Sequence, residues 1–263
     1  CMTVKQTLFS GQSEFQKVDI FDTESMGRVL TLDGLMMTTE RDEFYYHEMI
    51  SHIPMMSHKN PESVLVIGGG DGGTIREVLK HDTVKKVVLC EIDGMVVDAC
   101  KKYLPTIGCE LDNPKVEVKI EDAIEFIKDK KACYDVILID STDPMGPGEG
   151  LFTEEFYTNV KEALKQGGIM AAQSESPFIN QAEMKKMYPL LRKVFPIVDT
   201  FTGPIPSYPG GYWSWCFCSE TVSPFDYLDE ERAEKITKQC KIYNKEYHIA
   251  RFALPNFVKE LTK

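Results

Sequence analysis

Residues 64–73 read Val64-Leu65-Val66-Ile67-Gly68-Gly69-Gly70-Asp71-Gly72-Gly73, and this stretch decides the fold. Its four aliphatic residues predict a buried parallel strand, and the five glycines that follow predict a tight turn. The apolar spacing of residues 74–79 predicts a helix that begins directly after the turn. Glycines at this place let a ligand approach the N-terminus of that helix closely. The stretch therefore predicts a strand, turn and helix that bind a nucleotide-like ligand.

The glycine spacing alone does not name the ligand. Gly68, Gly70 and Gly73 match G-x-G-x-x-G, which NAD-dependent enzymes, S-adenosylmethionine-dependent enzymes and some turns without a ligand share. Asp71 is unusual here, because its carboxylate repels a pyrophosphate or the carboxylate of an amino acid. A ligand that carries an amine and no carboxylate is expected beside Asp71.

The rest of the chain repeats the alternation of strand and helix. Strands are expected at residues 84–90, 116–120, 134–139 and 168–173, with helices at 95–103, 123–128, 154–164 and 184–194. Residues 198–201 and 212–218 are expected to form two final strands. This alternation predicts an α/β fold, a doubly wound, Rossmann-like and mostly parallel sheet of the methyltransferase type, as the catalytic domain over residues 39–263.

The first 38 residues have a different pattern. Apolar and polar residues alternate within residues 4–37, and Asp33-Gly34 after residues 27–32 is a hairpin signal. We expect a small N-terminal antiparallel β domain over residues 1–38, with three or four strands. Such a sheet has too little core to be stable alone, so it should pack on the main domain or on another subunit.

A helix is expected over residues 44–57, and it is unusually rich in polar and aromatic residues. One reading is that it contributes Tyr46 and His47 to a site. The second reading is a packing helix with Phe44, Met49 and Ile53 inward and its His and Tyr side chains at the rim.

Composition narrows the function classes. The 263-residue chain is 43% hydrophobic and 27% charged, as folded soluble proteins are. Its net charge of −11, with no basic run, argues against nucleic acid or anionic membrane as partners and favours a cationic substrate. We expect a cytoplasmic protein, because no apolar stretch is long enough to span a membrane and no signal peptide is visible.

Eight scattered cysteines without C-x-x-C predict reduced thiols rather than metal ligands or disulfides. Because the sequence begins at Cys1 rather than Met, we expect a piece of chain to precede it.

Acidic residues follow four consecutive strands: Asp71, Glu91, Asp122, and Asp140 with Asp143. The carboxyl ends of parallel strands meet at one edge of a sheet, so these acids should surround one crevice. Five carboxylates without clustered lysine or arginine are costly unless a cationic or hydroxyl-rich ligand fills the space. Their pattern therefore predicts a binding site rather than a purely structural role.

The acids have separable roles. Glu91 lies 23 positions after Gly68, the usual offset for an acid that holds ribose hydroxyls. Asp122, followed by the small Ala123, suits the edge of an adenine. Asp140 and Asp143 are expected to form a pair that binds an ammonium group or takes a proton from an attacking amine, and residues 144–148 are expected to form a stiff loop over the site.

At this point the sequence closely resembles the polyamine aminopropyltransferases, and within them the spermidine synthases. The resemblance rests on five blocks between about residues 5 and 220, in family order: Leu32-Asp33-Gly34 with 39–44; 68–73; Glu91-Ile92-Asp93; 140–144 with Gly146-Pro147; and 205–211. It implies transfer of an aminopropyl group from decarboxylated S-adenosylmethionine to putrescine, which gives spermidine and 5′-methylthioadenosine.

The resemblance also implies residue roles. The nucleoside would be held by five residues: Gln16, Glu91, Asp122, Ala123 and Pro147. Asp71 would bind the aminopropyl nitrogen of the donor. Asp140 would be the catalytic acid–base residue, with Tyr46 and Tyr208 beside it as catalytic and substrate-binding residues. His47, Asp140 and Asp143 would contact the diamine.

The resemblance implies no metal and no cofactor apart from the donor co-substrate. It also implies a homodimer or homotetramer.

The nearest alternative function is spermine or thermospermine synthesis, because the length of the accepted amine depends on pocket depth. A more distant rival is an S-adenosylmethionine-dependent methyltransferase, against which Asp71 and the Asp140–Asp143 pair weigh. An NAD-dependent oxidoreductase is disfavoured, because no separate catalytic His or Lys constellation follows the core. A non-enzymatic module that binds polyamine or nucleoside would keep the acids without aligning an attack.

Overall fold

The larger of two sheets is built from the strand–turn–helix pattern of residues 64–79. The computed structural model describes residues 2–142 and 146–263, apart from the side chains of residues 146, 147 and 149. The strands of this sheet are β5 (Ser63–Gly68), β6 (Lys86–Glu91), β7 (Val116–Ile120), β8 (Tyr134–Asp140), β9 (Leu164–Gln173), β10 (Ile197–Pro204) and β11 (Tyr212–Ser219). They lie in the order β10-β11-β9-β8-β5-β6-β7, and only β11 runs antiparallel to the rest. The predicted doubly wound, mostly parallel sheet is confirmed.

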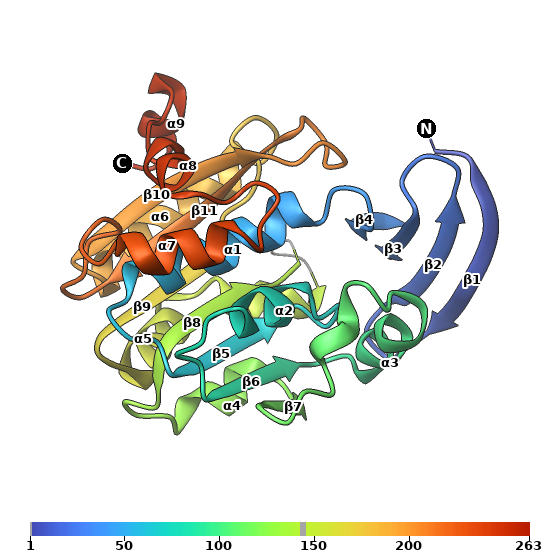
Figure 1. Ribbon diagram of the computed structural model, residues 1–263, viewed down its shortest axis with the longest axis horizontal. Helices are drawn as coiled ribbons and strands as arrows, with labels where there is room; N and C mark the ends of the chain where they lie inside the picture. Colours follow the sequence, from blue (N-terminus) through green and yellow to red (C-terminus); the bar gives the residue numbers. More distant parts are fainter. Residues whose placement is uncertain (1, 143–145) are drawn as a thin grey trace.

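Helices cover both faces of this sheet (Figure 1). One face carries α1 (Phe44–Ser57), α2 (Gly73–Leu79) and α3 (Gly94–Tyr103), and the other carries α4 (Ala123–Lys128), α5 (Glu154–Ala163) and α6 (Gln181–Val194). Side chains alternate along a strand, so Val64 and Val66 pack toward α2, whereas Leu65 and Ile67 pack toward α4 and α5. The aliphatic run therefore forms a strand that is buried on both faces.

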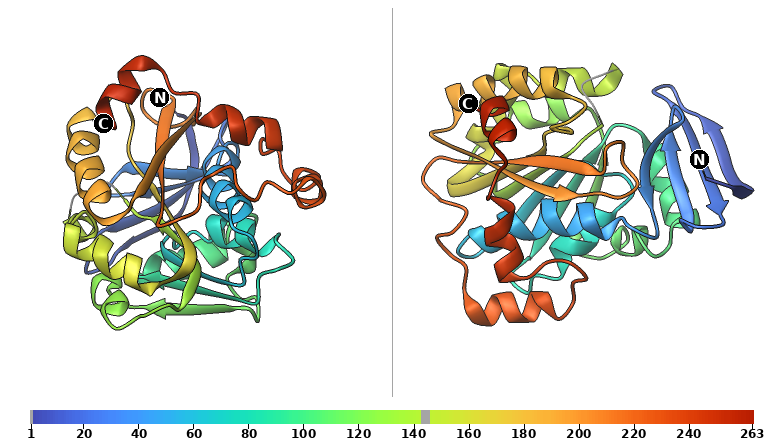
Figure 2. Two further views of the ribbon diagram at one scale, coloured as in Figure 1. Left: turned by 90° about the vertical axis from the view of Figure 1, so that its left-hand side faces the viewer. Right: turned by 90° about the horizontal axis from the view of Figure 1, so that it is seen from above.

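The N-terminal residues form a separate antiparallel sheet that projects from one end of the molecule (Figure 2). Its strands are β1 (Val4–Gln12), β2 (Lys17–Thr23), β3 (Arg28–Leu32) and β4 (Leu35–Thr39). Asp33 and Gly34 both have positive φ in the β3–β4 turn, as the predicted hairpin requires. The sheet packs Val18, Ile20 and Leu30 on α3, so it leans on the main domain as expected. The predicted boundary after residue 38 falls within β4.

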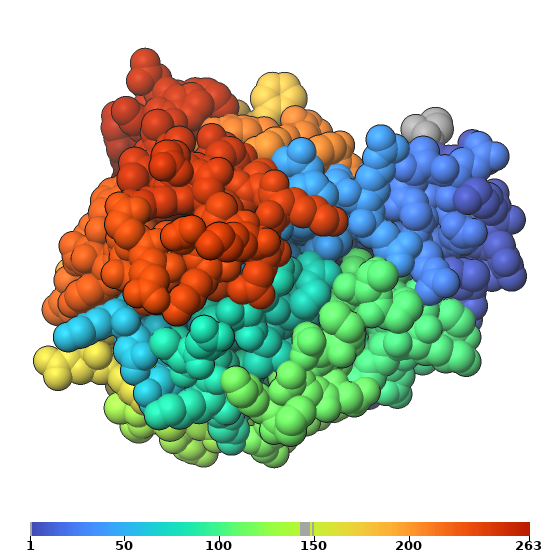
Figure 3. All heavy atoms as spheres, in the orientation of Figure 1, coloured from blue at the N-terminus to red at the C-terminus, as the bar shows by residue number. Residues whose placement is uncertain are grey.

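Helix α1 is buried almost all round, and the prediction that its His and Tyr side chains lie at the rim is wrong. His47 is only 3% exposed and Tyr46 is 7% exposed, whereas Phe44 is less buried than either. The His47 ring packs against Gly73 of α2, and the Tyr46 ring packs against Trp215 of β11. A C-terminal segment that the sequence pattern did not reveal, with α7 (Glu230–Thr237), α8 (Lys245–Arg251) and α9 (Asn256–Leu261), covers a further part of the helix. This segment lies over the middle of α1 in the space-filling view (Figure 3), and Glu48 of α1 accepts three backbone hydrogen bonds from residues 241–243.

The remaining predicted elements are present with shifted ends. Strand β6 begins two residues later than predicted and β9 begins four residues earlier. Short 3-10 helices, η1 (Gly108–Glu110) and η2 (Gly146–Leu151), complete the chain. Among the helices of the described residues, none has both the length and the apolar character that a bilayer crossing requires.

Candidate functional site

A cavity of about 330 Å³ opens at the carboxyl ends of β5, β6 and β8, where the strand-end acids meet. Its described lining includes six acidic residues: Asp42, Glu43, Asp71, Glu91, Asp122 and Asp140. No lysine or arginine belongs to that described lining. The cavity therefore attracts cations, as the net charge of the chain suggested.

Glu91, the last residue of β6, lies at one end of the cavity. Its Oε2 accepts a hydrogen bond of 3.2 Å from the backbone N–H of Gly70, and its Oε1 accepts one of 3.0 Å from the N–H of Asp93. Burial raises the pKa of this carboxyl to about 7, and the nearby Asp93 adds to the rise. Glu91 is thus anchored to the glycine turn and titrates close to physiological pH.

Two further predicted nucleoside residues flank Glu91. Gln16 donates a hydrogen bond of 3.0 Å from Nε2 to Oδ2 of Asp93, so the N-terminal sheet contributes directly to the cavity. Asp122 caps α4 by accepting a hydrogen bond of 2.8 Å from the N–H of Ile124, and Ala123 behind it is buried. An exposed carboxylate next to a small buried residue leaves room for a flat ring.

Asp140 lies at the end of β8, next to the first glycine of the turn. Its Oδ2 accepts a hydrogen bond of 2.6 Å from the hydroxyl of Thr74, and Tyr46 also hydrogen-bonds to this carboxyl. A Cβ at Gly69 would lie 2.7 Å from Oδ2 of Asp140, so only glycine allows this approach. Burial, and then the charge of Asp71, raise the pKa of Asp140. This is the character expected of a carboxylate that exchanges protons.

His47 lies between two carboxylates. Its Nδ1 is 2.6 Å from Oε2 of Glu43, and its Nε2 is 3.4 Å from Oδ2 of Asp71. Burial alone lowers the pKa of His47, but Asp71 and Glu43 outweigh burial and raise it well above its usual range. A Cβ at Gly73 would overlap the imidazole ring, so this glycine makes room for the histidine. Glu43 and Asp71 therefore favour the protonated imidazolium form of His47.

Two tyrosines complete the wall beside Asp140. The rings of Tyr46 and Tyr208 lie 6.2 Å apart, and the Tyr208 ring packs edge-on against Trp213 at 4.8 Å. The Tyr208 hydroxyl donates a hydrogen bond of 2.7 Å to the carbonyl of Met37, in β4. Burial and the charge of Asp140 raise the pKa of Tyr46 well above 10, so its hydroxyl stays protonated and is a donor.

Nine predicted site residues line this one cavity: Gln16, Tyr46, His47, Asp71, Glu91, Asp122, Ala123, Asp140 and Tyr208. Asp143 lies outside the described residues. Pro147 lies in η2, and its side chain is outside the described ones. Their individual roles stay predictions, because lining a cavity does not show what each residue binds.

Glu43 and Thr74 contact this group directly, although neither was predicted as a site residue. Glu43 stands four positions before His47, and this spacing places both on one side of a helical turn, so the signal was present in the sequence. Thr74 had no such signal. Its bond to Asp140 exists because β5 and β8 are neighbours in register, with Gly68 beside Asp140.

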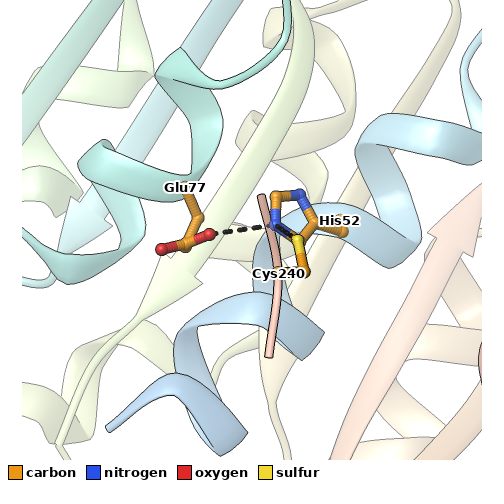
Figure 4. Close-up of side chains that lie close together, drawn as sticks. All are labelled: His52, Glu77 and Cys240. Carbon is orange, nitrogen blue, oxygen red and sulfur yellow. Dashed lines mark hydrogen bonds and ion pairs between the residues drawn. The ribbon is translucent and has the colours of Figure 1, made fainter. Parts of the chain in front are cut away.

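A second cluster of polar side chains lies outside the cavity (Figure 4). His52 Nε2 is 3.0 Å from Oε2 of Glu77 and 3.1 Å from Sγ of Cys240. The Glu77 carboxylate already pairs with Lys80 at 2.5 Å and with Arg76 at 2.9 Å. Two side-chain cations thus neutralise the one acid of the cluster, and its chemistry is that of an ion-pair network joining α1, α2 and the C-terminal segment.

Comparison with known proteins gives consistent matches over nearly the whole chain. Residues 43–228 match the sequence model of the spermine/spermidine synthase domain, and residues 1–40 match that of the spermidine synthase tetramerisation domain. A polyamine aminopropyltransferase of Thermotoga neapolitana is 49% identical over 260 residues, covering 98% of this chain and 88% of the relative. One of Alkaliphilus metalliredigens is 50% identical over 259 residues, covering 98% and 91%.

Solved structures agree with these sequence matches. A crystal structure of spermidine synthase in complex with the transition state analogue AdoDATO superposes with a TM-score of 0.97 at 48% identity, covering 99% of this chain and 89% of that one. The spermidine synthase of Thermotoga maritima gives a TM-score of 0.93 at 46% identity, with 99% and 89% covered. Fold, acidic cavity and relatives lead to the same conclusion: the chain belongs to the spermine/spermidine synthase family, and it is an aminopropyl-transferring enzyme.

Proposed function

We propose that this enzyme is a spermidine synthase, which transfers the aminopropyl group of decarboxylated S-adenosylmethionine to putrescine. The observation that carries the proposal is the placement of Asp71 and Asp140 on one acidic cavity whose described lining has no lysine or arginine. Both substrates of this reaction bring an amine and no carboxylate. A related spermidine synthase has been crystallised with the transition state analogue AdoDATO, which supports the same class of ligand for this cavity.

The donor occupies the end of the cavity near Glu91. We assign the ribose hydroxyls to Glu91, the adenine edge to Asp122 and Ala123, and the aminopropyl nitrogen to Asp71. The donor is a sulfonium, so its leaving group is a neutral thioether that needs no protonation. The reaction therefore requires neither a general acid for the leaving group nor a further cofactor.

Activation of the acceptor is the harder step. An alkylammonium has a pKa of about 10, as lysine has, and must lose a proton before its nitrogen attacks carbon. Asp140 accepts that proton. Because its pKa is raised, the difference between the pKa of Asp140 and that of the amine is smaller than for an ordinary aspartate. Tyr46 and Thr74, which both hydrogen-bond to Asp140, fix the carboxylate so that the amine is oriented for in-line attack.

The test is the release of 5′-methylthioadenosine from decarboxylated S-adenosylmethionine, with putrescine, cadaverine and spermidine supplied separately. Release with putrescine alone, or at least about tenfold faster than with the two longer amines, supports the proposal. A preference for spermidine would instead make the enzyme a spermine or thermospermine synthase. Methyl transfer, or nucleoside binding without turnover, would overturn the assignment.

The assembly and location belong to the same proposal. The N-terminal sheet matches the family's tetramerisation domain, which supports a homodimer or homotetramer, and sedimentation at micromolar concentration tests this state. We also propose that the enzyme works in the cytoplasm, where fractionation of the source cells should find it.

A further inference from the structure

We propose that Glu43 and Arg76 are positioning residues, which hold the ring of His47 against Asp71 so that the donor-binding carboxylate keeps one orientation. The inference rests on the proposed function, because it assigns a purpose to Asp71. It concerns two side chains that are not among the predicted site residues.

The first step is the geometry of His47. Both ring nitrogens face carboxylate oxygens, Glu43 at 2.6 Å on one side and Asp71 at 3.4 Å on the opposite side. The ring is 3% exposed, and the backbone of Gly73 lies directly against it. With both nitrogens engaged as donors, His47 has no lone pair left to accept a proton from an amine. It is therefore not the base of the reaction, although it lies in the cavity wall.

The second step is the anchor behind Glu43. Arg76 Nη2 lies 2.7 Å from the same Oε2 of Glu43 that faces His47. The remaining nitrogens of Arg76 are also engaged, Nε with Glu77 at 2.9 Å and Nη1 with the carbonyl of Thr106 at 2.9 Å. The guanidinium is thus fixed on three sides, and it fixes Glu43 in turn. Glu43 cannot turn away from His47 without leaving a charged donor of Arg76 unpaired.

The third step is charge. The contacts form a chain of alternating sign: Arg76 positive, Glu43 negative, His47 positive, Asp71 negative. Asp140 also faces this chain, because the charge of His47 lowers the pKa of Asp140 whereas that of Asp71 raises it. Two neighbouring carboxylates without a cation share a proton. The positive charge of His47 offsets part of the repulsion between these two carboxylates, and two amine-bearing substrates benefit from both.

The consequence is a specific pH signature when Glu43 is changed. Glu43→Gln removes one of the two anions beside His47, so the pKa of His47 falls while Asp71, Asp140, Arg76 and Tyr46 remain. The His47 that supports Asp71 is the protonated form. Activity of the variant should therefore be lost as pH rises through the lowered pKa, and regained as pH falls.

The experiment compares wild type, Glu43→Gln and Glu43→Asp from about pH 6 to pH 9. We expect kcat/KM for the donor to fall about tenfold in Glu43→Gln at about pH 8.5, as loss of one charge-assisted bond does, and to recover toward about pH 6.5. Glu43→Asp, which keeps the charge, should retain most of the activity. The KM for the diamine should change less than the KM for the donor.

The matched control is Glu62→Gln, which removes a carboxylate that pairs with Lys85 at 2.8 Å and lies outside the described lining of the cavity. Its pH profile should have the wild-type shape. An equal loss at every pH in Glu43→Gln, or a new alkaline ionisation in Glu62→Gln as well, would mean that Glu43 is merely structural.

Nuclear magnetic resonance of the His47 ring separates this inference from the proposed function. In wild type the ring should stay protonated well above the pH at which a free imidazole loses its proton, and in Glu43→Gln it should titrate at lower pH. This readout holds even if the enzyme uses a different amine or a different donor. A wild-type His47 that titrates near its ordinary value would overturn the inference while leaving the proposed reaction untouched.

Discussion

Thr74, the second residue of α2, donates a hydrogen bond of 2.6 Å to Asp140, the last residue of β8. The hydroxyl favours the ionised form of Asp140, against burial and the charge of Asp71, which raise the pKa of this carboxyl. Helix α2 and strand β8, which β6 and β7 separate in the chain, thus meet at one carboxylate, and their contact lowers its pKa.

Thr74→Val should reduce kcat by about tenfold, because it removes the hydroxyl and keeps the shape of the side chain. The acid limb of the pH–rate profile should move to higher pH, since Asp140 loses a bond to its charged form. Thr74→Ser, which keeps the donor, is the matched control. Equal profiles for the valine and serine variants would contradict this role of Thr74.

Asp140→Asn should preserve the fold and lower kcat by about a hundredfold or more, which is the typical contribution of a positioned acid–base group. The amide still accepts the bond from Thr74, so thermal unfolding should change little. Steady-state release of 5′-methylthioadenosine gives the rate, and near-normal turnover would remove Asp140 from the mechanism.

Asp71→Ala should weaken discrimination against the carboxylated donor, S-adenosylmethionine. The ratio of kcat/KM for the two donors should fall by about tenfold, because Asp71 no longer attracts the amine or repels the carboxylate. Asp71→Asn keeps an oxygen that accepts the 2.8 Å bond from the N–H of Gly73, and so it separates charge from local structure. Unchanged donor preference in both variants would count against the assignment.

Nucleoside binding should depend on pH through Glu91. The pKa of Glu91, about 7, lies above the ordinary glutamate value, so the carboxylate that we assign to the ribose hydroxyls is lost as pH falls below 7. We expect the Kd for 5′-methylthioadenosine to rise about tenfold between about pH 8 and pH 6. Calorimetry measures this, and Glu91→Gln should bind weakly at both pH values. A flat Kd in wild type would show that Glu91 does not titrate in this range.

Gly73→Ala should destabilise the protein by about 1–3 kcal/mol, because the new Cβ would overlap the His47 ring. Gly94→Ala is the matched control, since Gly94 also begins a helix and its Cβ meets only Ile120 at 3.4 Å. That substitution should be neutral or stabilising by up to about 1 kcal/mol. Denaturant unfolding measures the free energy of unfolding of both variants. Equal values would contradict the overlap expected between a Cβ at Gly73 and the His47 ring.

Several features of the fold and site followed from local pattern. The run at residues 64–73 predicted the central strand, the turn and the start of α2, because burial on both faces and a close backbone approach leave few residue types that fit. The strand-end acids predicted the cavity, because parallel strands bring their carboxyl ends to one edge. The pair Asp33-Gly34 predicted the hairpin, because Asp and Gly tolerate the positive φ that such turns need and that both residues have.

Further features depend on pairs of residues that only the folded chain brings together. The reading that placed the His and Tyr side chains of α1 at the rim was wrong, because Gly73 packs against His47 and Trp215 packs against Tyr46. Residues 241–243 cover the same helix at Glu48, from 193 to 195 positions away. Tyr208 is oriented by the carbonyl of Met37 across 171 positions, and Arg76 anchors Glu43 across 33.

The sequence by itself therefore determined the class of sheet, the edge at which the cavity opens and the acidic character of that edge. The tertiary structure decided the charge of His47, the bonds that set Asp140 and the burial of α1. The physical reason is the distance along the chain between the interacting residues. Strands and turns depend on residues that are neighbours in the sequence, whereas a pKa depends on the charges and dipoles that folding brings within a few ångströms.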